Sequence, residues 1–160
     1  MLVEKKICFD MDGTIADLYA VDGWLEMLSV THNPYPYANA KPMLNMAVFA
    51  RLLHKAQRLG YQIVIVSWLS KQTTEEYDKA VTQAKLQWLK SHLPSVKWDD
   101  IIIAPHGTPK HELCSGILFD DEEHNRNEWG KGAFEPNEIL PFLRNLGTWQ
   151  GDLKELEMLI

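Results

Sequence analysis

The sequence predicts an α/β fold in which a doubly wound parallel sheet lies between two layers of helices. Apolar runs of strand length alternate with segments of helical periodicity, and the run "YQIVIVSW" at 61–68 is rich in β-branched residues. Such a run is typical of a strand that is buried on both faces. Strands separated by helices pair in parallel through right-handed crossovers. The 160 residues suffice for one such domain with a sizeable core.

Four segments are predicted to be strands of this sheet. The first is "KKICF" at 5–9 and the second is the β-branched run at 61–68. The third is "DDIIIAP" at 99–105 and the fourth is "GILFDD" at 116–121. Ligands of doubly wound sheets bind beyond the carboxyl ends of the strands, so the residues that follow each run are the first candidates for a functional site.

The predicted helices lie between these strands and after the last one. They cover 22–29, 43–60, 73–94 and 136–147. Gly60 is a typical C-terminal cap, Thr73 or Thr74 is a candidate N-cap, and Pro141 marks a break or kink. The Pro- and Asn-rich segment 30–42 is predicted to be a loop, and "DLKELEMLI" at the end of the chain is predicted to be a terminal helix.

Composition and charge exclude several classes of protein. The formal net charge of −6 argues against a nucleic-acid or anionic-membrane partner, since both require a basic face. No apolar run approaches 18 residues, and the N-terminus lacks the features of a signal peptide. The two cysteines, Cys8 and Cys114, lack the spacing of a metal site, so we expect reduced thiols in a cytoplasmic protein.

Charged and polar groups gather at the predicted carboxyl ends of the strands. They are Asp10, Asp12, Ser67, Lys110, Asp120 and Asp121. Taken singly, each has an ordinary explanation, such as a turn acid, a cap or a solvated lysine. Taken together, they fall where a doubly wound sheet would bring them into one crevice. Four carboxylates would repel one another there unless they surrounded a hard divalent cation such as Mg²⁺.

This set of residue types fits phosphoryl transfer. Asp10 is placed to attack phosphorus and form an aspartyl-phosphate. Asp12 can protonate the leaving oxygen and then deprotonate water. Ser67 can donate a hydrogen bond to a phosphoryl oxygen, and Lys110 can neutralise charge in the transition state. Gly13 permits a sharp turn that brings the backbone amides close to the phosphate, which makes Met11 and Asp12 candidate phosphate-binding residues.

Four segments resemble the four motifs of the haloacid dehalogenase (HAD) superfamily. They are "FDMDGT", "IVIVS", the lysine of "TPK" and "ILFDD", in the order of that superfamily. The resemblance implies a Rossmann-like fold, Asp10 as nucleophile, Asp12 as acid and base, and Ser67 and Lys110 as phosphate ligands. It also implies that Mg²⁺ is held by Asp10, the Asp12 backbone carbonyl and the pair Asp120 and Asp121, with Asp121 as the direct ligand of the pair. The acid at Asp12 favours a phosphatase over a dehalogenase.

Within the superfamily, "FDMDGTIADL", "PYPYANAKPML" and "ILFDDEEHN" are most similar to the 5′(3′)-deoxyribonucleotidases. That resemblance implies a deoxynucleotide substrate. The sequence departs from those enzymes in its short insert at 18–41, which predicts a minimal cap and a more open site. We therefore divide the chain into a catalytic domain at 1–146 and a C-terminal tail at 147–160.

The sequence defines the substrate and the oligomeric state less closely than the fold. Tyr35, Tyr37 and Trp68 are the aromatic residues that we expect at the mouth of the site, where they could stack on a base. The alternatives are a phosphatase for a sugar phosphate or another small metabolite, a nucleic-acid end-processing phosphatase, and a non-catalytic HAD-like binding protein. The leucine stripe of the tail packs either on its own domain, which we favour, or on a second subunit in a homodimer.

Overall fold

A computed structural model of the protein describes residues 4–147. Within this range a parallel sheet contains five strands in the order β5-β4-β1-β6-β7. These are β1 (Lys6–Phe9), β4 (Gln62–Trp68), β5 (Asp100–Ala104), β6 (Ile117–Phe119) and β7 (Ala133–Phe134). The predicted fold class is confirmed. The two-residue β7 was missed, because two residues carry no period that could identify a strand.

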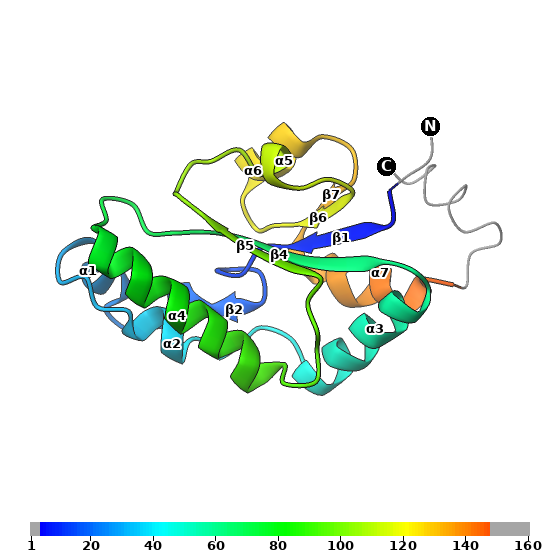
Figure 1. The fold of residues 1–160 in the computed structure, drawn as a ribbon, viewed down its shortest axis with the longest axis horizontal. Coiled ribbons are helices and arrows are strands. Elements are labelled where there is room, and N and C mark those ends of the chain that lie inside the picture. Colours follow the sequence, from blue (N-terminus) through cyan, green and yellow to red (C-terminus); the bar gives the residue numbers. More distant parts are fainter. Residues whose placement is uncertain (1–3, 148–160) are drawn as a thin grey trace.

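Helices cover both faces of the sheet (Figure 1). On one face lie α3 (Met46–Arg58), α4 (Glu75–His92) and α7 (Ile139–Asn145), and on the other lie α5 (Lys110–Leu113) and α6 (Glu123–Trp129). The two long helices begin at side-chain caps, since Asn45 accepts a hydrogen bond from the Val48 amide and Thr74 accepts one from the Tyr77 amide. The helices therefore start close to the positions that the sequence predicts.

The core is divided by the sheet. Alternate residues of β1, such as Phe9, point toward the face covered by α3 and α7, where Phe9 stacks on Phe119 with ring centroids 5.5 Å apart. Cys8 belongs to a separate buried cluster with Val64 and Leu118. The central strand β1 is thus packed on both faces, which fixes the position of the residues that follow it.

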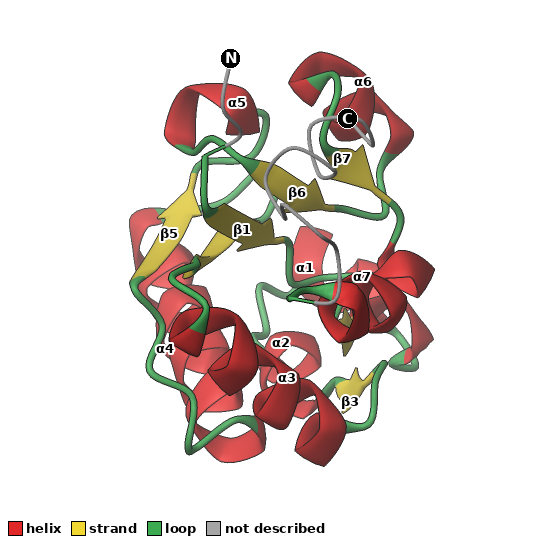
Figure 2. Cartoon of the chain, turned by 90° about the vertical axis from the view of Figure 1, so that its right-hand side faces the viewer, coloured by secondary structure: helices red, strands yellow, loops and turns green. Residues whose placement is uncertain are grey.

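The insert between β1 and α3 is more ordered than predicted. It contains β2 (Ala16–Asp17), the 3₁₀ turn η1 (Leu18–Ala20), α1 (Trp24–Ser29), α2 (Tyr35–Asn39) and β3 (Lys41–Pro42). The expectation of a loop at 30–42 was therefore wrong. Pro36 lies in the first turn of α2, where a helix tolerates proline, and α2 packs against α4 (Figure 2).

The helix predicted at 136–147 is divided into two parts. The 3₁₀ turn η2 (Pro136–Glu138) precedes α7, and Pro141 lies in the first turn of α7. The break therefore comes before Pro141, which occupies a position that needs no intrahelical donor. The tail predicted at 147–160 lies outside the described residues, except for Gly147.

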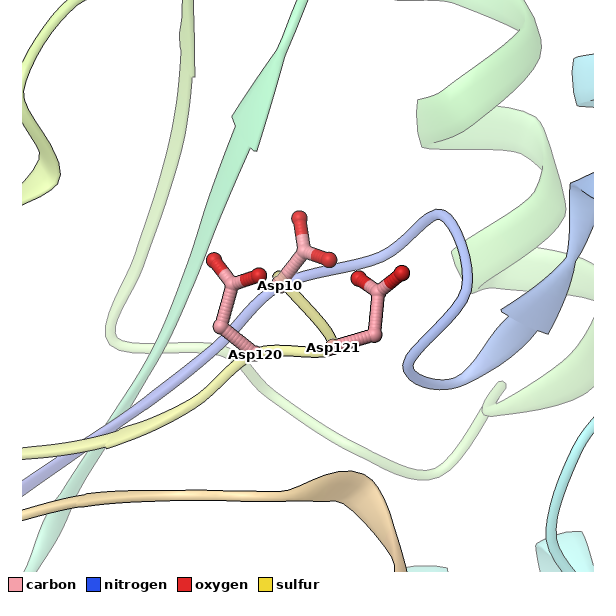
Figure 3. A group of neighbouring side chains, drawn as sticks. All are labelled: Asp10, Asp120 and Asp121. Carbon is pink, nitrogen blue, oxygen red and sulfur yellow. The ribbon is translucent and has the colours of Figure 1, made fainter. Parts of the chain in front are cut away.

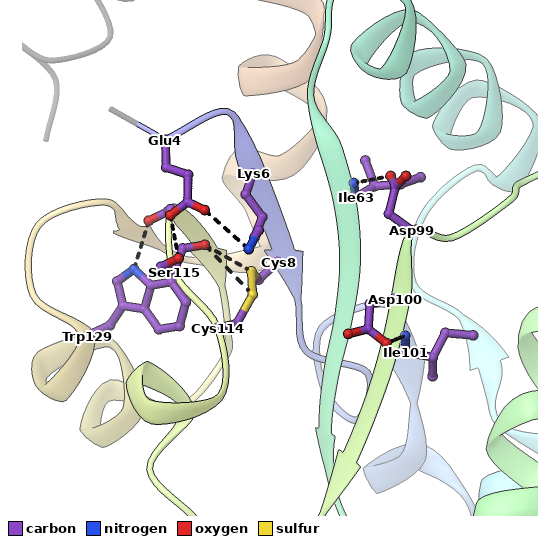
Figure 4. The surroundings of a disulfide bond; sticks show 11 residues. Glu4, Lys6, Cys8, Ile63, Asp99, Asp100, Ile101, Cys114, Ser115 and Trp129 are labelled. Carbon is purple, nitrogen blue, oxygen red and sulfur yellow. Dashed lines mark hydrogen bonds and ion pairs between the residues drawn. A yellow bond between two sulfur atoms is a disulfide. The ribbon is translucent and has the colours of Figure 1, made fainter. Parts of the chain in front are cut away.

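A disulfide joins Cys8 of β1 to Cys114, which follows α5 (Figure 4). The expectation of two reduced thiols is thus corrected. The two cysteines are 106 residues apart in the chain, and they meet only because the crossover after β5 returns beside β1. In the part of the chain that the structure describes, no helix has both the length and the apolar character needed to cross a membrane.

Candidate active site

Three carboxylates meet where β1 and β6 end. The strands are neighbours in register, with Phe9 opposite Phe119, so Asp10 and Asp120 follow them side by side. One carboxylate oxygen from each of Asp10, Asp120 and Asp121 lies within 4.8 Å of the others. Figure 3 shows the three carboxylate groups gathered at one place. The parallel pairing of two strands is therefore enough to assemble the acidic cluster.

Lys110 lies against two of these acids. Its Nζ atom is 2.8 Å from Oδ1 of Asp10 and 2.7 Å from Oδ2 of Asp120, and the residue is 3% exposed. Burial disfavours the charged form, but the attraction of Asp10 and Asp120 outweighs it and raises the pKa of Lys110. Lys110 also lies over the ring of Trp68, 5.2 Å from its centroid. The lysine is a fixed positive charge beside Asp10.

The loop after β1 closes tightly around the acids. The carbonyl of Met11 accepts hydrogen bonds from the amides of residues 14, 15 and 16. Gly13 has a φ of +80°, and a Cβ atom there would lie 2.3 Å from Oδ2 of Asp121. Only glycine combines this conformation with so close an approach. Thr14 donates a hydrogen bond of 2.8 Å to Oδ2 of Asp10 and accepts one from the Asp121 amide.

The acidic cluster carries more negative charge than its lysine can balance. Among the described residues, the cluster contains three carboxylates, and the ammonium of Lys110 pairs with only two of them, Asp10 and Asp120. Burial and the nearby Asp10 raise the pKa of both Asp120 and Asp121, because both effects disfavour the charged form of a carboxyl group. An excess of carboxylate oxygens in a small volume is the donor set that a hard divalent cation prefers. The residues present therefore fit a magnesium site.

The two members of the acidic pair are held differently. The Oδ1 atom of Asp120 accepts from the Glu122 amide, and its Oδ2 atom accepts from Lys110 and from Asn125. The Asp121 carboxylate contacts the Thr14 hydroxyl, at 3.3 Å, and also lies in hydrogen-bonding contact with Asp10. Among the described residues, fewer protein donors hold Asp121 than hold Asp120, and the role of Asp121 as the direct metal ligand remains a prediction.

A second buried lysine, Lys85 of α4, is an unpredicted member of the site. Its Nζ atom lies 2.8 Å from Oδ2 of Asp12, 2.6 Å from Oγ of Ser67 and 2.7 Å from the carbonyl of Trp68. The signal for it was present in the sequence. Tyr77, Val81 and Lys85 follow one another at intervals of four residues, so the lysine interrupts the apolar stripe of the helix.

Asp12 lies between Lys85 and the acidic cluster, and both influence its carboxyl group. Burial raises the pKa of its carboxyl group, Lys85 opposes the shift, and Asp10 adds to it. The side chain of Asp12 is 16% exposed. Ser67 is fully buried and its Oγ atom accepts from Lys85. The predicted phosphate contacts of Ser67, of Lys110 and of the Met11 and Asp12 backbone remain predictions.

A cavity of about 490 Å³ opens above Asp10 and Asp12. Residues of the insert, including Tyr19, Trp24 and Tyr37, form part of its wall. Trp68 also lines it and packs against His106, with the two rings tilted and their centroids 4.8 Å apart. Among the residues that the structure describes, Tyr35 is exposed and absent from the cavity wall. Tyr37, which was also expected at the mouth of the site, lines the cavity, but it packs beside α4 and is 4% exposed.

Comparison with known proteins agrees with this geometry. The model of the family "5' nucleotidase, deoxy (Pyrimidine), cytosolic type C protein" matches residues 43–134. The match includes Ser67, Lys85, Lys110 and the acidic pair. No curated protein matched the chain.

A solved structure with a TM-score above 0.5 shares the fold. D,D-heptose 1,7-bisphosphate phosphatase from Burkholderia thailandensis superposes with a TM-score of 0.53 at 11% sequence identity, over 89% of this chain and 97% of that one. The HAD domain of the effector protein Lem4 from Legionella pneumophila gives a TM-score of 0.46 at 19% identity, over 91% of this chain and 95% of that one. The family match covers more than half of the chain. The protein therefore belongs to this deoxynucleotidase family of HAD-type phosphatases and is a phosphomonoester hydrolase.

Proposed function

We propose that the protein hydrolyses a small phosphomonoester, a deoxynucleoside monophosphate, through an aspartyl-phosphate on Asp10 with Mg²⁺ as cofactor. One observation carries the proposal. Asp10 lies on the floor of a cavity, within hydrogen-bonding distance of a buried lysine and beside two further acids that offer metal ligands. Nucleophile, positive charge and cation ligands are thus present where a phosphate would enter.

The metal would be held by Asp10, the backbone carbonyl of Asp12, and Asp121, with Asp120 behind them. When bound, Mg²⁺ would neutralise charge on the phosphoryl oxygens and draw the phosphate toward Asp10. Gly13 supports this assignment, because any side chain there would occupy the space beside the Asp121 carboxylate.

Asp10 is held in one orientation by two hydrogen bonds. Lys110 binds its Oδ1 atom and Thr14 binds its Oδ2 atom. In the first step a carboxylate oxygen of Asp10 forms a bond to phosphorus, and the bond from phosphorus to the leaving oxygen breaks. Lys110 stabilises the charge that spreads over the phosphoryl oxygens during this exchange.

Asp12 supplies and recovers the proton. Its raised pKa favours a protonated carboxyl group that gives its proton to the leaving oxygen. In the second step the Asp12 carboxylate takes a proton from water while the water oxygen attacks phosphorus. The bond between phosphorus and Asp10 then breaks, so that both carboxyl groups return to their starting states.

The substrate class rests on the family match and on the shape of the cavity. A volume of about 490 Å³ is within the range of small-molecule sites, and the insert at 18–41 contributes aromatic and aliphatic side chains to its wall. We propose that this insert acts as a small cap over one nucleotide and that residues 1–146 form the catalytic unit. The net charge of −6 disfavours a nucleic-acid strand as substrate.

A side-by-side assay tests this assignment at physiological salt. The panel contains all deoxynucleoside monophosphates, a set of sugar phosphates and oligonucleotides with a 3′- or 5′-phosphate, each with Mg²⁺ and with chelator. We expect magnesium-dependent release of phosphate, fastest from a deoxynucleotide. Faster release from an oligonucleotide, or activity confined to sugar phosphates, would overturn the substrate class while leaving the mechanism in place.

A further inference from the structure

The ammonium of Lys85 is saturated by groups of the protein. An ammonium has three N–H donors and no acceptor, and three acceptors lie 2.6–2.8 Å from it. They are the carboxylate of Asp12, the hydroxyl of Ser67 and the carbonyl of Trp68. The residue is fully buried, and its charge lies 4.9 Å from the centroid of the Tyr37 ring. No donor remains with which Lys85 could bind a phosphate directly.

We propose that Lys85 is the positioning residue of the proton-transfer half of the site, acting through Asp12 and Ser67. The proposal rests on the proposed function, since it assigns Asp12 the exchange of a proton with the leaving group. Lys85 binds Asp12 through Oδ2, which leaves Oδ1 to meet the leaving oxygen. A carboxyl group that is held in this way gives up its proton at one fixed place.

The contact with Lys85 fixes the direction of the hydrogen bonds that the Ser67 hydroxyl can make. Because an ammonium can only donate, the Oγ atom of Ser67 must accept from Lys85. The hydroxyl hydrogen of Ser67 is then left for another acceptor, and a phosphoryl oxygen is the acceptor that the site would supply. One buried lysine thus sets the orientation of both the acid and the hydroxyl.

The cost of burying a charge supports a functional role. An apolar residue at position 85 would continue the stripe of Tyr77 and Val81 without any loss of solvation. The lysine instead fastens the middle of α4 to the end of β4 and to the loop after β1. A lysine that served only stability would influence all substrates alike, whereas a lysine that orients an acid influences those that need the acid.

Leaving groups distinguish these two roles. Nitrophenolate departs from phosphorus with little help from a proton, whereas phenolate is far more basic and depends on a donor. The first step forms the bond from Asp10 to phosphorus in both cases, and kcat/KM reports that step. The ratio of kcat/KM for p-nitrophenyl phosphate to kcat/KM for phenyl phosphate therefore measures how well Asp12 is placed, whatever the natural substrate is.

The experiment compares the wild type with Lys85→Met and Lys79→Met in the presence of Mg²⁺. Lys79 lies on the same helix, six residues earlier, and is exposed in a weak pair with Glu75, so it is a matched control. We expect Lys85→Met to lose about tenfold to a hundredfold more kcat/KM on phenyl phosphate than on p-nitrophenyl phosphate. Lys79→Met keeps the wild-type ratio.

A double-variant cycle shows whether Lys85 acts through Asp12. In an Asp12→Asn background, Lys85→Met is expected to leave the ratio unchanged. If Lys85→Met does not fold, Lys85→Gln replaces it, because a neutral amide retains hydrogen-bond donors at this buried position. Equal losses on both esters, no loss, or a further change of the ratio in the Asp12→Asn background would overturn the inference alone. A wild type that hydrolyses neither ester would overturn the proposed function and this inference with it.

Discussion

The two halves of the site differ in how their buried charges are balanced. Each half holds a buried lysine beside an aromatic ring, Lys110 beside Trp68 and Lys85 beside Tyr37. In the half formed by β1, β6 and α5, three clustered carboxylates share one lysine, which pairs with two of them. In the half formed by β4 and α4, a single carboxylate, Asp12, pairs with Lys85. The first half is short of positive charge and the second is balanced.

This difference assigns each half a separate task. The half with excess negative charge is completed by a cation and a phosphate, and it would perform the attack on phosphorus. The balanced half needs no external charge, and it would hold the proton that moves to and from the leaving group. Substitutions in one half should therefore change metal dependence, and substitutions in the other should change the response to the leaving group.

The largest effect is expected for Asp10→Asn. An amide has nearly the shape of the carboxylate but is a far poorer nucleophile, so turnover of p-nitrophenyl phosphate should fall by roughly 10⁴-fold or more. Circular dichroism and the melting temperature should show an intact fold, with equal or higher stability in metal-free buffer because one of the repelling acids is gone. Activity near that of the wild type in a folded Asp10→Asn protein would exclude this residue as nucleophile.

Lys110→Met should separate turnover from metal affinity. Loss of the charge beside Asp10 should lower kcat by about 10²–10³-fold. The same change makes the acidic cluster more negative, so Mg²⁺ should raise the melting temperature by more than it does in the wild type. Lys85→Met, which alters only the balanced half, should leave the magnesium-dependent shift close to that of the wild type. Equal shifts in the two lysine variants would contradict the division of charge.

Magnesium should stabilise the wild type by mass action. At ten times its Kd the ion contributes about 1.4 kcal/mol, and for a chain of this size each kcal/mol raises the melting temperature by about 2–4 °C. Asp121→Ala should lose most of this shift and Asp120→Ala less, because the Asp120 carboxylate is already held by protein groups. Absence of a shift in the wild type at millimolar Mg²⁺ would count against the site.

The smallest effect on stability is expected for two glycine variants, one of which is a control for the other. Gly13 and Gly107 both have positive φ, but a Cβ on Gly107 would meet no atom within 4 Å. Gly13→Ala and Gly107→Ala should therefore each lose about 1 kcal/mol of stability from backbone strain. Only Gly13→Ala should also lose the magnesium-dependent shift, since its methyl group displaces Asp121. A retained shift in Gly13→Ala would show that Asp121 is not the ligand.

Much of this site could be predicted from the sequence, because parallel strands place their carboxyl ends at one edge of the sheet. That rule alone brings Asp10, Asp120 and Asp121 together without any knowledge of side-chain contacts. The long helices follow from their period, and Thr74 was one of the two residues predicted as the N-cap of α4. The cap at Asn45 was not predicted.

The rest depends on contacts between distant segments. Lys85 reaches Asp12 across 73 residues of sequence, and neither residue type nor spacing names that partner, although the lysine does interrupt an apolar stripe. Thr14 was not predicted as a site residue, yet its hydroxyl contacts both Asp10 and Asp121. The aromatic residues Tyr37 and Trp68 were expected at the mouth of the site, and both line the cavity, but the contacts of their rings with two buried lysines were not foreseen.

Direct trapping of the intermediate tests the central claim, that Asp10 carries the phosphoryl group while Asp12 handles the proton. The Asp12→Asn variant is incubated with p-nitrophenyl phosphate and Mg²⁺, quenched in acid and digested, and its peptides are analysed by mass spectrometry. Without its base the second step is slow, so we predict one phosphoryl group on Asp10, absent from the Asp10→Asn/Asp12→Asn double variant. Phosphate release with no phosphorylated peptide, or a phosphoryl group on another residue, would contradict the account.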